Sequence, residues 1–394
     1  MSFFSSYKSY FKNIMKTGGI YIHAPFCTEK CIYCDYYSLA NHKDLIELFI
    51  KNLCKEIELT SKNVNIDWTI DTLFIGGGTP SLLTLSQIEK VIEEINKHFN
   101  LSNLKEFTIE ANPGEFNSKK MHDFQLLGVN RISLGFQSLD NDILKFLSRW
   151  HSVKDCIDSY TNARKAGFNN INIDMLFGIP KQSLKEWKKN LDLIIELSPE
   201  HISAYPLTIE RNTPLYNAVE SGGIKAPHQK KTVAMYSHTM DLLNKGEFLQ
   251  YETSSYSKKN NQCQHNLHYW RRDPYLAFGP SGHGYSNGNR YWNIKDLNKY
   301  IEVLNSDNLP IQKTEILNKE NIFNEMILNG LKISDGINMN KIKKLFSNEI
   351  YYLLSNKIIE WGDCLIKEEE SIRLSKKGYF IADEITLDFM NSYI

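Results

Sequence analysis

The stretch C-T-E-K-C-I-Y-C at residues 27–34 places three cysteines within eight residues. Structural zinc sites usually have four ligands, often as two separated pairs, and no neighbour supplies an obvious fourth, although His23 is close. A [4Fe–4S] cluster held by three thiolates leaves one iron without a protein ligand. The spacing therefore favours an iron–sulfur cluster on Cys27, Cys31 and Cys34, with zinc as the alternative.

The composition of the chain indicates the kind of protein and the cellular compartment in which these cysteines occur. The chain has 394 residues, with 46 basic and 46 acidic side chains and seven cysteines. The balanced charge does not predict a broad nucleic-acid footprint. An odd number of cysteines without a secretion signal indicates a reducing cytoplasm. The first 17 residues carry lysines and no acid, which leaves a peripheral membrane contact open, and Met15 competes with Met1 as the true start.

Six short apolar runs alternate with longer amphipathic stretches. This alternation predicts parallel βα units, whose right-handed crossovers can roll the sheet into a barrel or partial barrel. Helical spacing is expected at 44–60 and 153–166, and apparent capping boxes at Ser86–Glu89 and Ser183–Glu186 begin two further helices. The expected strands are residues 19–23, 71–75, 107–111, 131–135, 171–175 and 201–205.

Conspicuous residues follow each of these runs. Because chemistry in such barrels gathers at the carboxyl ends of the strands, we expect them to share one mouth. In chain order they are the cysteine stretch, G-G-G-T-P (76–80), E-A-N-P-G (110–114), G-F-Q (135–137), Asp174 and Ala204-Tyr205.

The pattern changes toward the C-terminus and suggests further units. We expect an N-terminal extension (1–18), a barrel (19–225), a barrel extension (226–310) and a small α+β domain (311–394). In the last unit, predicted helices at 325–333 and 339–346 precede a hairpin at 358–374. This order is winged-helix-like.

The sequence Y-I-H-A-P-F-C (21–27) with the following C-x3-C-x2-C spacing resembles the radical S-adenosylmethionine (SAM) superfamily, and within it the coproporphyrinogen oxidase branch. The resemblance runs from about Gly18 to the C-terminus. It implies a partial (β/α)6 barrel with a [4Fe–4S] cluster at its mouth. The open iron would bind SAM, and the reduced cluster could cleave it to a 5′-deoxyadenosyl radical.

The resemblance also implies which residues hold SAM. Gly77 and Gly78 would let the backbone approach the methionyl ammonium, Glu110 would accept hydrogen bonds from the amine or ribose, and Arg149 would pair with the carboxylate. Each residue alone has a plainer explanation, such as a turn glycine or a core aromatic, so the expectation rests on their coincidence at strand ends. The other expected SAM contacts are Tyr21, Tyr33, Thr79, Gln137, Asp174 and Ala204.

Two functions within this branch compete. The oxygen-independent coproporphyrinogen III oxidases have a further cysteine two residues past the third, where this chain has Tyr36. The stretch H-N-L-H-Y-W at 265–270 fits the H-N-x-x-Y-W motif of the HemW family of heme chaperones. The motif implies that His265 ligates heme beside flat aromatic faces. Without that family context, a capped turn with packed aromatics explains the same residues.

The expected function is therefore that of a heme chaperone with a [4Fe–4S] cluster, SAM and heme. It would retain the capacity to cleave SAM but lack coproporphyrinogen oxidase activity, and the oxidase is the alternative. Expected partners are heme, heme-accepting proteins with respiratory ones among the candidates, and an electron donor for the cluster. We expect no nucleic acid, a cytoplasmic location, and a homodimer as the candidate assembly.

Overall fold

The computed structural model describes residues 16–393. The choice between Met1 and Met15 as the start falls on residues that lie outside this part of the chain. None of the described helices is long and apolar enough to cross a bilayer.

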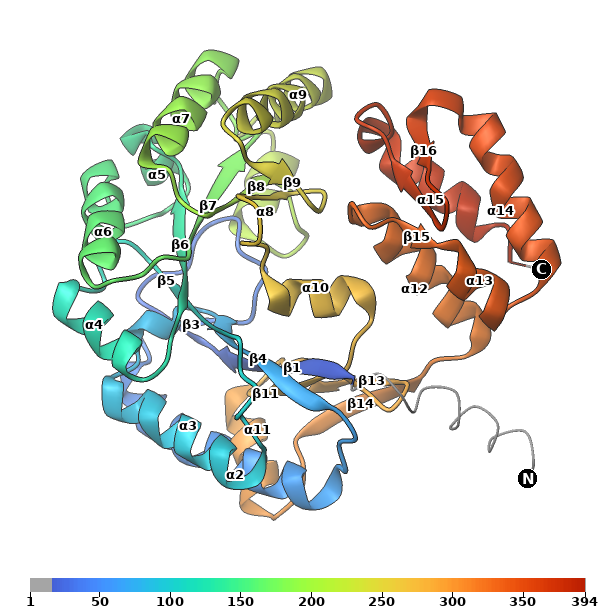
Figure 1. The fold of residues 1–394 in the computed structure, drawn as a ribbon. Helices are drawn as coiled ribbons and strands as arrows, with labels where there is room; N and C mark the ends of the chain where they lie inside the picture. The colour runs from blue at the N-terminus through green and yellow to red at the C-terminus, as the bar shows by residue number, and fades with distance from the viewer. Residues whose placement is uncertain (1–15, 394) are drawn as a thin grey trace, which may run out of the picture.

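A curved parallel sheet forms the centre of the molecule (Figure 1). Its neighbouring strands follow the chain order, and all six predicted strands are confirmed within a few residues. The fold class, a partial (β/α)6 barrel, is confirmed as well. The strands are β1 (Thr17–Ala24), β4 (Thr69–Gly77), β5 (Glu106–Ala111), β6 (Arg131–Gln137), β7 (Ile171–Phe177) and β8 (His201–Pro206).

Further strands extend the sheet at both edges to twelve within the described residues. Beyond β1, β11 (Tyr275–Phe278) is parallel, and β12 (His283–Ser286), β13 (Asn289–Asn293) and β14 (Ile311–Ile316) follow antiparallel. Beyond β8 come β10 (Ser255–Ser257) and β9 (Leu249–Gln250). A separate short pair, β2 (Phe26–Cys27) and β3 (Leu39–Ala40), frames the cysteine stretch.

Helices cover the outer face of the sheet (Figure 1). The long ones are α2 (Ile46–Asn63), α3 (Leu85–His98), α4 (Ser118–Leu126), α6 (Val153–Lys165), α7 (Leu184–Leu197) and α9 (Gln229–Lys245). Shorter helices are α5 (Asn141–Phe146) and α8 (Pro214–Glu220), and α11 (Leu297–Asn305) packs on α2.

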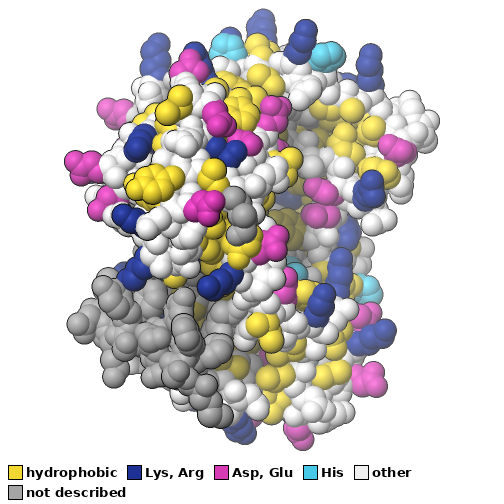
Figure 2. Space-filling model, turned by 90° about the vertical axis from the view of Figure 1, so that its right-hand side faces the viewer, with side chains coloured by type: hydrophobic (Ala, Val, Ile, Leu, Met, Phe, Trp, Pro, Cys, Tyr) yellow, Lys and Arg dark blue, Asp and Glu magenta, His cyan; other side chains and the backbone are white. Residues whose placement is uncertain are grey.

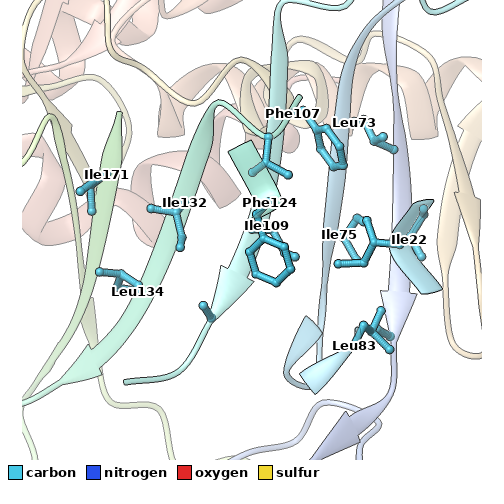
Figure 3. Packing of buried hydrophobic residues seen from close by; sticks show 14 of the residues in the cluster. Ile22, Leu73, Ile75, Leu83, Phe107, Ile109, Phe124, Ile132, Leu134 and Ile171 are labelled. Atoms are coloured by element: carbon cyan, nitrogen blue, oxygen red, sulfur yellow. The ribbon is translucent and has the colours of Figure 1, made fainter. Parts of the chain in front are cut away.

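The main core lies between the sheet and these helices. Figure 3 shows Ile75 and Ile109 of the central strands beside Phe124 of α4, and all three are at most 1% exposed. Burying each such side chain contributes about 1.5–3 kcal/mol. In β5, β6 and β7 the apolar side chains of this core alternate with polar ones, such as Glu110, Ser133 and Asp174.

The capping predictions are half right. Ser183 caps α7 with a reciprocal hydrogen bond from Glu186, as predicted. The predicted box at Ser86–Glu89 is wrong: Thr84 caps α3, and Gln87 closes the box. The glutamine amide can accept from the Thr84 backbone just as a carboxylate would, so a threonine two residues earlier takes the cap.

The stretch containing H-N-L-H-Y-W forms a helix, α10 (Gln264–Arg271), rather than a capped turn. In Figure 1 this helix lies inside the curve of the sheet, opposite the outer helices. It packs against β1 and β4 and against α12 of the C-terminal region.

The C-terminal region has a hydrophobic core of its own, including Phe323, Ile327, Leu354 and Phe389. The two predicted helices and the hairpin are present. Helix α14 was not predicted, because its last residues fall in the range expected for the hairpin. The elements are α12 (Lys319–Lys332), β15 (Ile337–Asn338), α13 (Met339–Leu345), α14 (Asn348–Trp361), β16 (Leu365–Lys367), β17 (Ser371–Leu374) and α15 (Ala382–Met390). Figure 2 shows basic and acidic side chains interspersed over this side of the molecule.

Candidate cluster and cofactor site

The cysteine stretch follows β1 and lies at the carboxyl end of the barrel strands. Thr79 Oγ1 donates to Cys27 Sγ at 3.5 Å, and Arg149 Nη1 donates to Cys31 Sγ at 3.3 Å. Burial raises the pKa of Cys34 to about 11, with the nearby thiols of Cys31 and Cys27 adding to the shift. Two hydrogen-bond donors point at sulfur atoms, and the three thiols are close enough to shift one another's pKa. This arrangement suits cysteines that bind a metal centre as thiolates.

No three Cys, His, Asp or Glu side chains within residues 16–393 are arranged to hold a metal ion. The thiols therefore have to turn toward a common centre to bind a cluster. His23 cannot complete a zinc site as it stands: its Nε2 bonds to Tyr37 O at 2.8 Å, and its Nδ1 pairs with the Tyr21 hydroxyl at 3.1 Å. The donor set that remains is three thiols without a fourth ligand, which fits an open [4Fe–4S] cluster better than zinc.

The glycine run after β4 lies tightly against the cysteine stretch. Gly78 N donates to Ala24 O at 2.9 Å, and Thr79 N donates to Phe26 O at 2.6 Å. A Cβ on Gly78 would lie 2.6 Å from Phe26 O, which is too close for any side chain. Gly77 has a φ of +107°, in the region that favours glycine. The protein's own packing thus already requires these glycines.

A chain of hydrogen bonds connects two of the cysteines. Arg149 Nη2 donates to Asn112 Oδ1 at 2.5 Å, and Asn112 Nδ2 donates to Thr79 Oγ1 at 2.8 Å. With the two sulfur contacts, the chain runs from Cys27 through Thr79, Asn112 and Arg149 to Cys31. Asn112 was not predicted to have a role, although it lies in the E-A-N-P-G stretch (110–114) at the end of β5.

Two carboxyl groups lie side by side in the barrel. Glu110 Oε2 accepts from Gly77 N at 3.0 Å, and Asp174 accepts from Ser133 at 2.7 Å and from Asn172 at 2.8 Å. Burial and the charge of Asp174 together raise the pKa of Glu110 to about 7. Both predicted carboxylates are therefore in the barrel, and one of them changes its charge near neutral pH.

Two tyrosines reach into this mouth. Tyr36 is 63% exposed, yet the walls of the mouth and then the charge of Glu110 raise its pKa to about 12. At Tyr205, near the end of β8, burial and the charge of Asp174 raise the pKa of the phenol well above its ordinary value. Tyr36 occupies the position of the missing fourth cysteine, so this position holds an aromatic side chain that faces the barrel.

The remaining predicted SAM residues differ in their packing and burial. Tyr33 packs against the hydrophobic cluster formed by Ile143, Leu147, Leu176 and Ile179. Gln137 ends β6 with a φ of +65°, which strains a residue other than glycine. Ala204 is fully buried, and its N–H donates to Ser254 O at 2.8 Å. Ala204 therefore offers no free backbone donor.

The side chain of His265, the predicted heme ligand, is enclosed. It is 0% exposed, Nδ1 pairs with Thr72 Oγ1 at 2.8 Å, and Nε2 pairs with the Tyr269 hydroxyl at 2.7 Å. Its ring stacks on Phe74 at 5.2 Å, and burial places its pKa well below the ordinary value. Ligation of iron by His265 stays a prediction, and it requires the ring to leave this pocket.

The helix that carries His265 is anchored at both ends. Glu106 accepts from Gln264 N at 2.8 Å and from His265 N at 3.0 Å, so a carboxylate caps the N-terminus of α10. His268, the second histidine of the H-N-L-H-Y-W stretch, bonds to Asp71 at 2.8 Å and to Asp273 at 3.0 Å. Both anchors fix α10 at the amino ends of β4 and β5.

Comparison with known proteins agrees with this geometry. Residues 21–194 match the family model of the radical SAM superfamily. The heme chaperone HemW of Bacillus subtilis (strain 168) is 32% identical to this chain over 93% of it and 97% of the relative. The chain belongs to the HemW family.

Other members and neighbours agree with this membership. The HemW of Lactococcus lactis is 30% identical over 96% of this chain and 98% of its own. The mitochondrial radical S-adenosyl methionine domain-containing protein 1 of Danio rerio is 32% identical over 93% of this chain and 85% of its own. The solved structure of coproporphyrinogen III oxidase (HemN) from Escherichia coli matches with a TM-score of 0.82 at 17% identity, over 96% of this chain and 91% of that one. That likeness shows a shared fold.

Proposed function

We propose that this HemW family chain binds a [4Fe–4S] cluster, SAM and heme, and delivers heme to acceptor proteins. The heme chaperones HemW of Bacillus subtilis and Lactococcus lactis match it along nearly their whole length, and this is the observation that carries the proposal. Within the fold shared with HemN, Tyr36 stands where the oxidases have a cysteine, which favours the chaperone over the oxidase.

In this proposal Cys27, Cys31 and Cys34 hold the cluster, and the cluster when bound supplies an electron-donating iron centre open to SAM. Thr79 and Arg149 stabilise the sulfur ligands, since each already donates to a cysteine. Arg149 Nε is buried and has no hydrogen-bond partner among the described residues. Because an unpaired buried donor costs about 1–3 kcal/mol, this N–H is suited to a carboxylate such as that of SAM.

Glu110 and Asp174 provide acceptors for the amine and hydroxyl groups of SAM. Gly77, Gly78, Thr79 and Gln137 surround the same space from the ends of β4 and β6. Tyr21 and Tyr33 supply aromatic surface and Ala204 a methyl group on its walls. Heme-accepting proteins, an electron donor and a second copy of the chain are the partners proposed for this activity.

Cysteine replacement tests the cluster assignment. Alanine at Cys27, Cys31 or Cys34 is expected to abolish the brown chromophore of the anaerobically reconstituted protein and to lower its iron and sulfide content to background. Cys54→Ala and Cys364→Ala serve as controls and are expected to keep the full content. Unchanged iron and sulfide in the triad variants would contradict the assignment.

A further inference from the structure

A large groove lies between the C-terminal end of α10, the β12–β13 turn and the C-terminal region. We name it the α10 groove and define it by Trp270, Tyr285, Met326, Lys341 and Leu345. Its cavity volume is about 990 Å³, at the upper end of the range for small-molecule sites. It begins at Trp270, the last residue of the H-N-L-H-Y-W stretch, whereas His265 of that stretch does not line it.

The groove combines flat apolar surface with a surplus of positive charge. Two indole rings, of Trp68 and Trp270, line it with Met326, Ile333 and Leu345. The lining holds five basic and three acidic side chains; Arg271 is paired with Asp335 at 2.8 Å and Arg272 with Glu325 outside the lining, which leaves a formal surplus of one positive charge. The basic ones are Lys16, Arg271, Arg272, Lys341 and Lys344, and the acidic ones Asp67, Asp273 and Asp335. A planar apolar molecule with two carboxylates matches this lining in shape and in charge.

Tyr285 is the lining residue best suited to bind iron. Arg272 Nη2 donates to its hydroxyl at 3.2 Å, and the guanidinium groups of Arg272 and Arg290 lie 5.7 and 5.1 Å from the centre of its ring. Glu325 holds both arginines, at 2.8 and 2.5 Å. Tyrosine is an established axial ligand of ferric heme, and nearby cations compensate the charge of a coordinated phenolate.

A continuous series of rings connects this tyrosine with the motif histidine. The ring centre of His265 lies 5.0 Å from that of Tyr269, Tyr269 lies 4.6 Å from Tyr275, and Tyr275 lies 6.4 Å from Tyr285. Arg290 also donates to the Tyr275 hydroxyl at 3.3 Å. His265 can therefore affect the groove by fixing these rings, without touching a ligand there.

We propose that heme binds in the α10 groove with Tyr285, in place of the His265 predicted from the motif, as the ligand of ferric iron, with its propionates on Arg271 and Lys341 and with His265 as a positioning residue. This inference rests on the proposed function and deepens it. Coordination replaces the phenolic O–H bond by an O–Fe(III) bond and releases the proton to solvent, with no change in oxidation state.

Spectroscopy of the full-length protein with its cluster and ferric heme tests the ligand. Tyr285→Phe is expected to remove the phenolate-to-iron charge-transfer band from the heme difference spectrum and to raise the heme Kd at least tenfold. Tyr352→Phe, on the exposed surface of α14, is the matched control and is expected to resemble the wild type. His265→Ala is expected to weaken binding while keeping the charge-transfer band.

The propionate contacts are tested by replacing Arg271 and Lys341, which are exposed, so that the variants are expected to fold. The wild type is expected to bind heme dimethyl ester about tenfold more weakly than heme, and the double variant Arg271→Gln, Lys341→Gln to bind both alike. If the wild type binds heme but Tyr285→Phe keeps its spectrum, or the double variant keeps the discrimination, the groove assignment is wrong and the proposed function survives. A wild type that binds no heme overturns both.

Discussion

The side chain of Glu110 is surrounded by features that make its charge sensitive to pH. It is buried beside Asp174, and its pKa of about 7 follows from burial first and from that neighbour second. A carboxylate accepts hydrogen bonds from an ammonium group, and its protonated form does so poorly. The protonation state of Glu110 should therefore affect the affinity of the protein for SAM.

We predict that SAM affinity falls as the pH is lowered from 8 to 6, because Glu110 gains a proton across this range. Glu110→Gln should bind SAM about tenfold more weakly at pH 8 and lose most of this pH dependence, whereas the exposed Asp192→Asn should behave as the wild type. Equilibrium dialysis with SAM on the reconstituted protein measures both. An undiminished pH dependence in Glu110→Gln would rule out this role.

His268 makes a different contribution, to stability. Burial opposes its charge, but the hydrogen bonds to Asp273 and Asp71 outweigh burial and raise its pKa to about 9. A histidine whose folded pKa exceeds the unfolded value near 6.5 contributes stability that is complete below about pH 6.5 and is lost as the pH rises through about 9. The shift corresponds to about 3 kcal/mol.

The expected result is that the free energy of unfolding of the wild type falls between pH 6.5 and 9.5 by more than that of His268→Gln. Urea denaturation at a series of pH values measures it, with the exposed His42→Gln as the control. Parallel pH profiles of the wild type and His268→Gln would show that the Asp71–His268–Asp273 contact adds nothing.

The residue types at the site were largely predictable, and their partners were not. The cysteines, Glu110 and Asp174 were predicted because they lie at the ends of strands, and Arg149 because the family resemblance implies it. The enclosure of His265 was not foreseen, since it depends on Thr72 of β4, 193 positions away in the chain. Likewise, nothing in the spacing of His268 indicates that it meets Asp71, 197 positions away.

At the scale of elements, the turn after β4 joins two loops that both belong to the cofactor site. Gly78 and Thr79 donate to the backbone of the segment between β1 and the cysteines. The glycine-rich turn and the cysteine stretch therefore hold each other in position.

Gly78→Ala is predicted to break this contact. The added Cβ would meet Phe26 O at 2.6 Å and Ala24 O at 2.9 Å, and overpacking of this kind costs about 1–3 kcal/mol. Gly223→Ala is the matched control, because its nearest neighbour would lie at 3.4 Å. Urea midpoints and cluster content should both fall for Gly78→Ala alone, and equal values for the two variants would contradict the packing argument.

The elements themselves were predictable to different degrees. Strands β1 and β4–β8 were found because short stretches rich in Ile, Phe, Tyr or Thr end at glycine, proline or polar clusters, as strands do. Helix α10 was not predicted, because its eight residues carry buried polar side chains whose partners come from other elements. Helix α14 was missed where its end overlaps the expected hairpin.

At the scale of the molecule, the sheet places two candidate sites at opposite ends. The cysteines, Glu110 and Tyr36 lie at the carboxyl ends of the barrel strands, and α10 covers the amino ends, with its groove toward the C-terminal region. Separate sites for SAM and heme fit a protein that carries heme better than one that oxidises a porphyrinogen beside the cluster.

The most direct test of the heme chaperone assignment offers two ligands to one preparation. Anaerobically reconstituted protein with SAM and a reductant is incubated separately with coproporphyrinogen III and with heme, and the products and the bound pigment are measured. We predict that heme is retained and then passes to an apo-acceptor, while coproporphyrinogen III is recovered unchanged. Efficient formation of protoporphyrinogen IX, with no heme retained, would contradict the account.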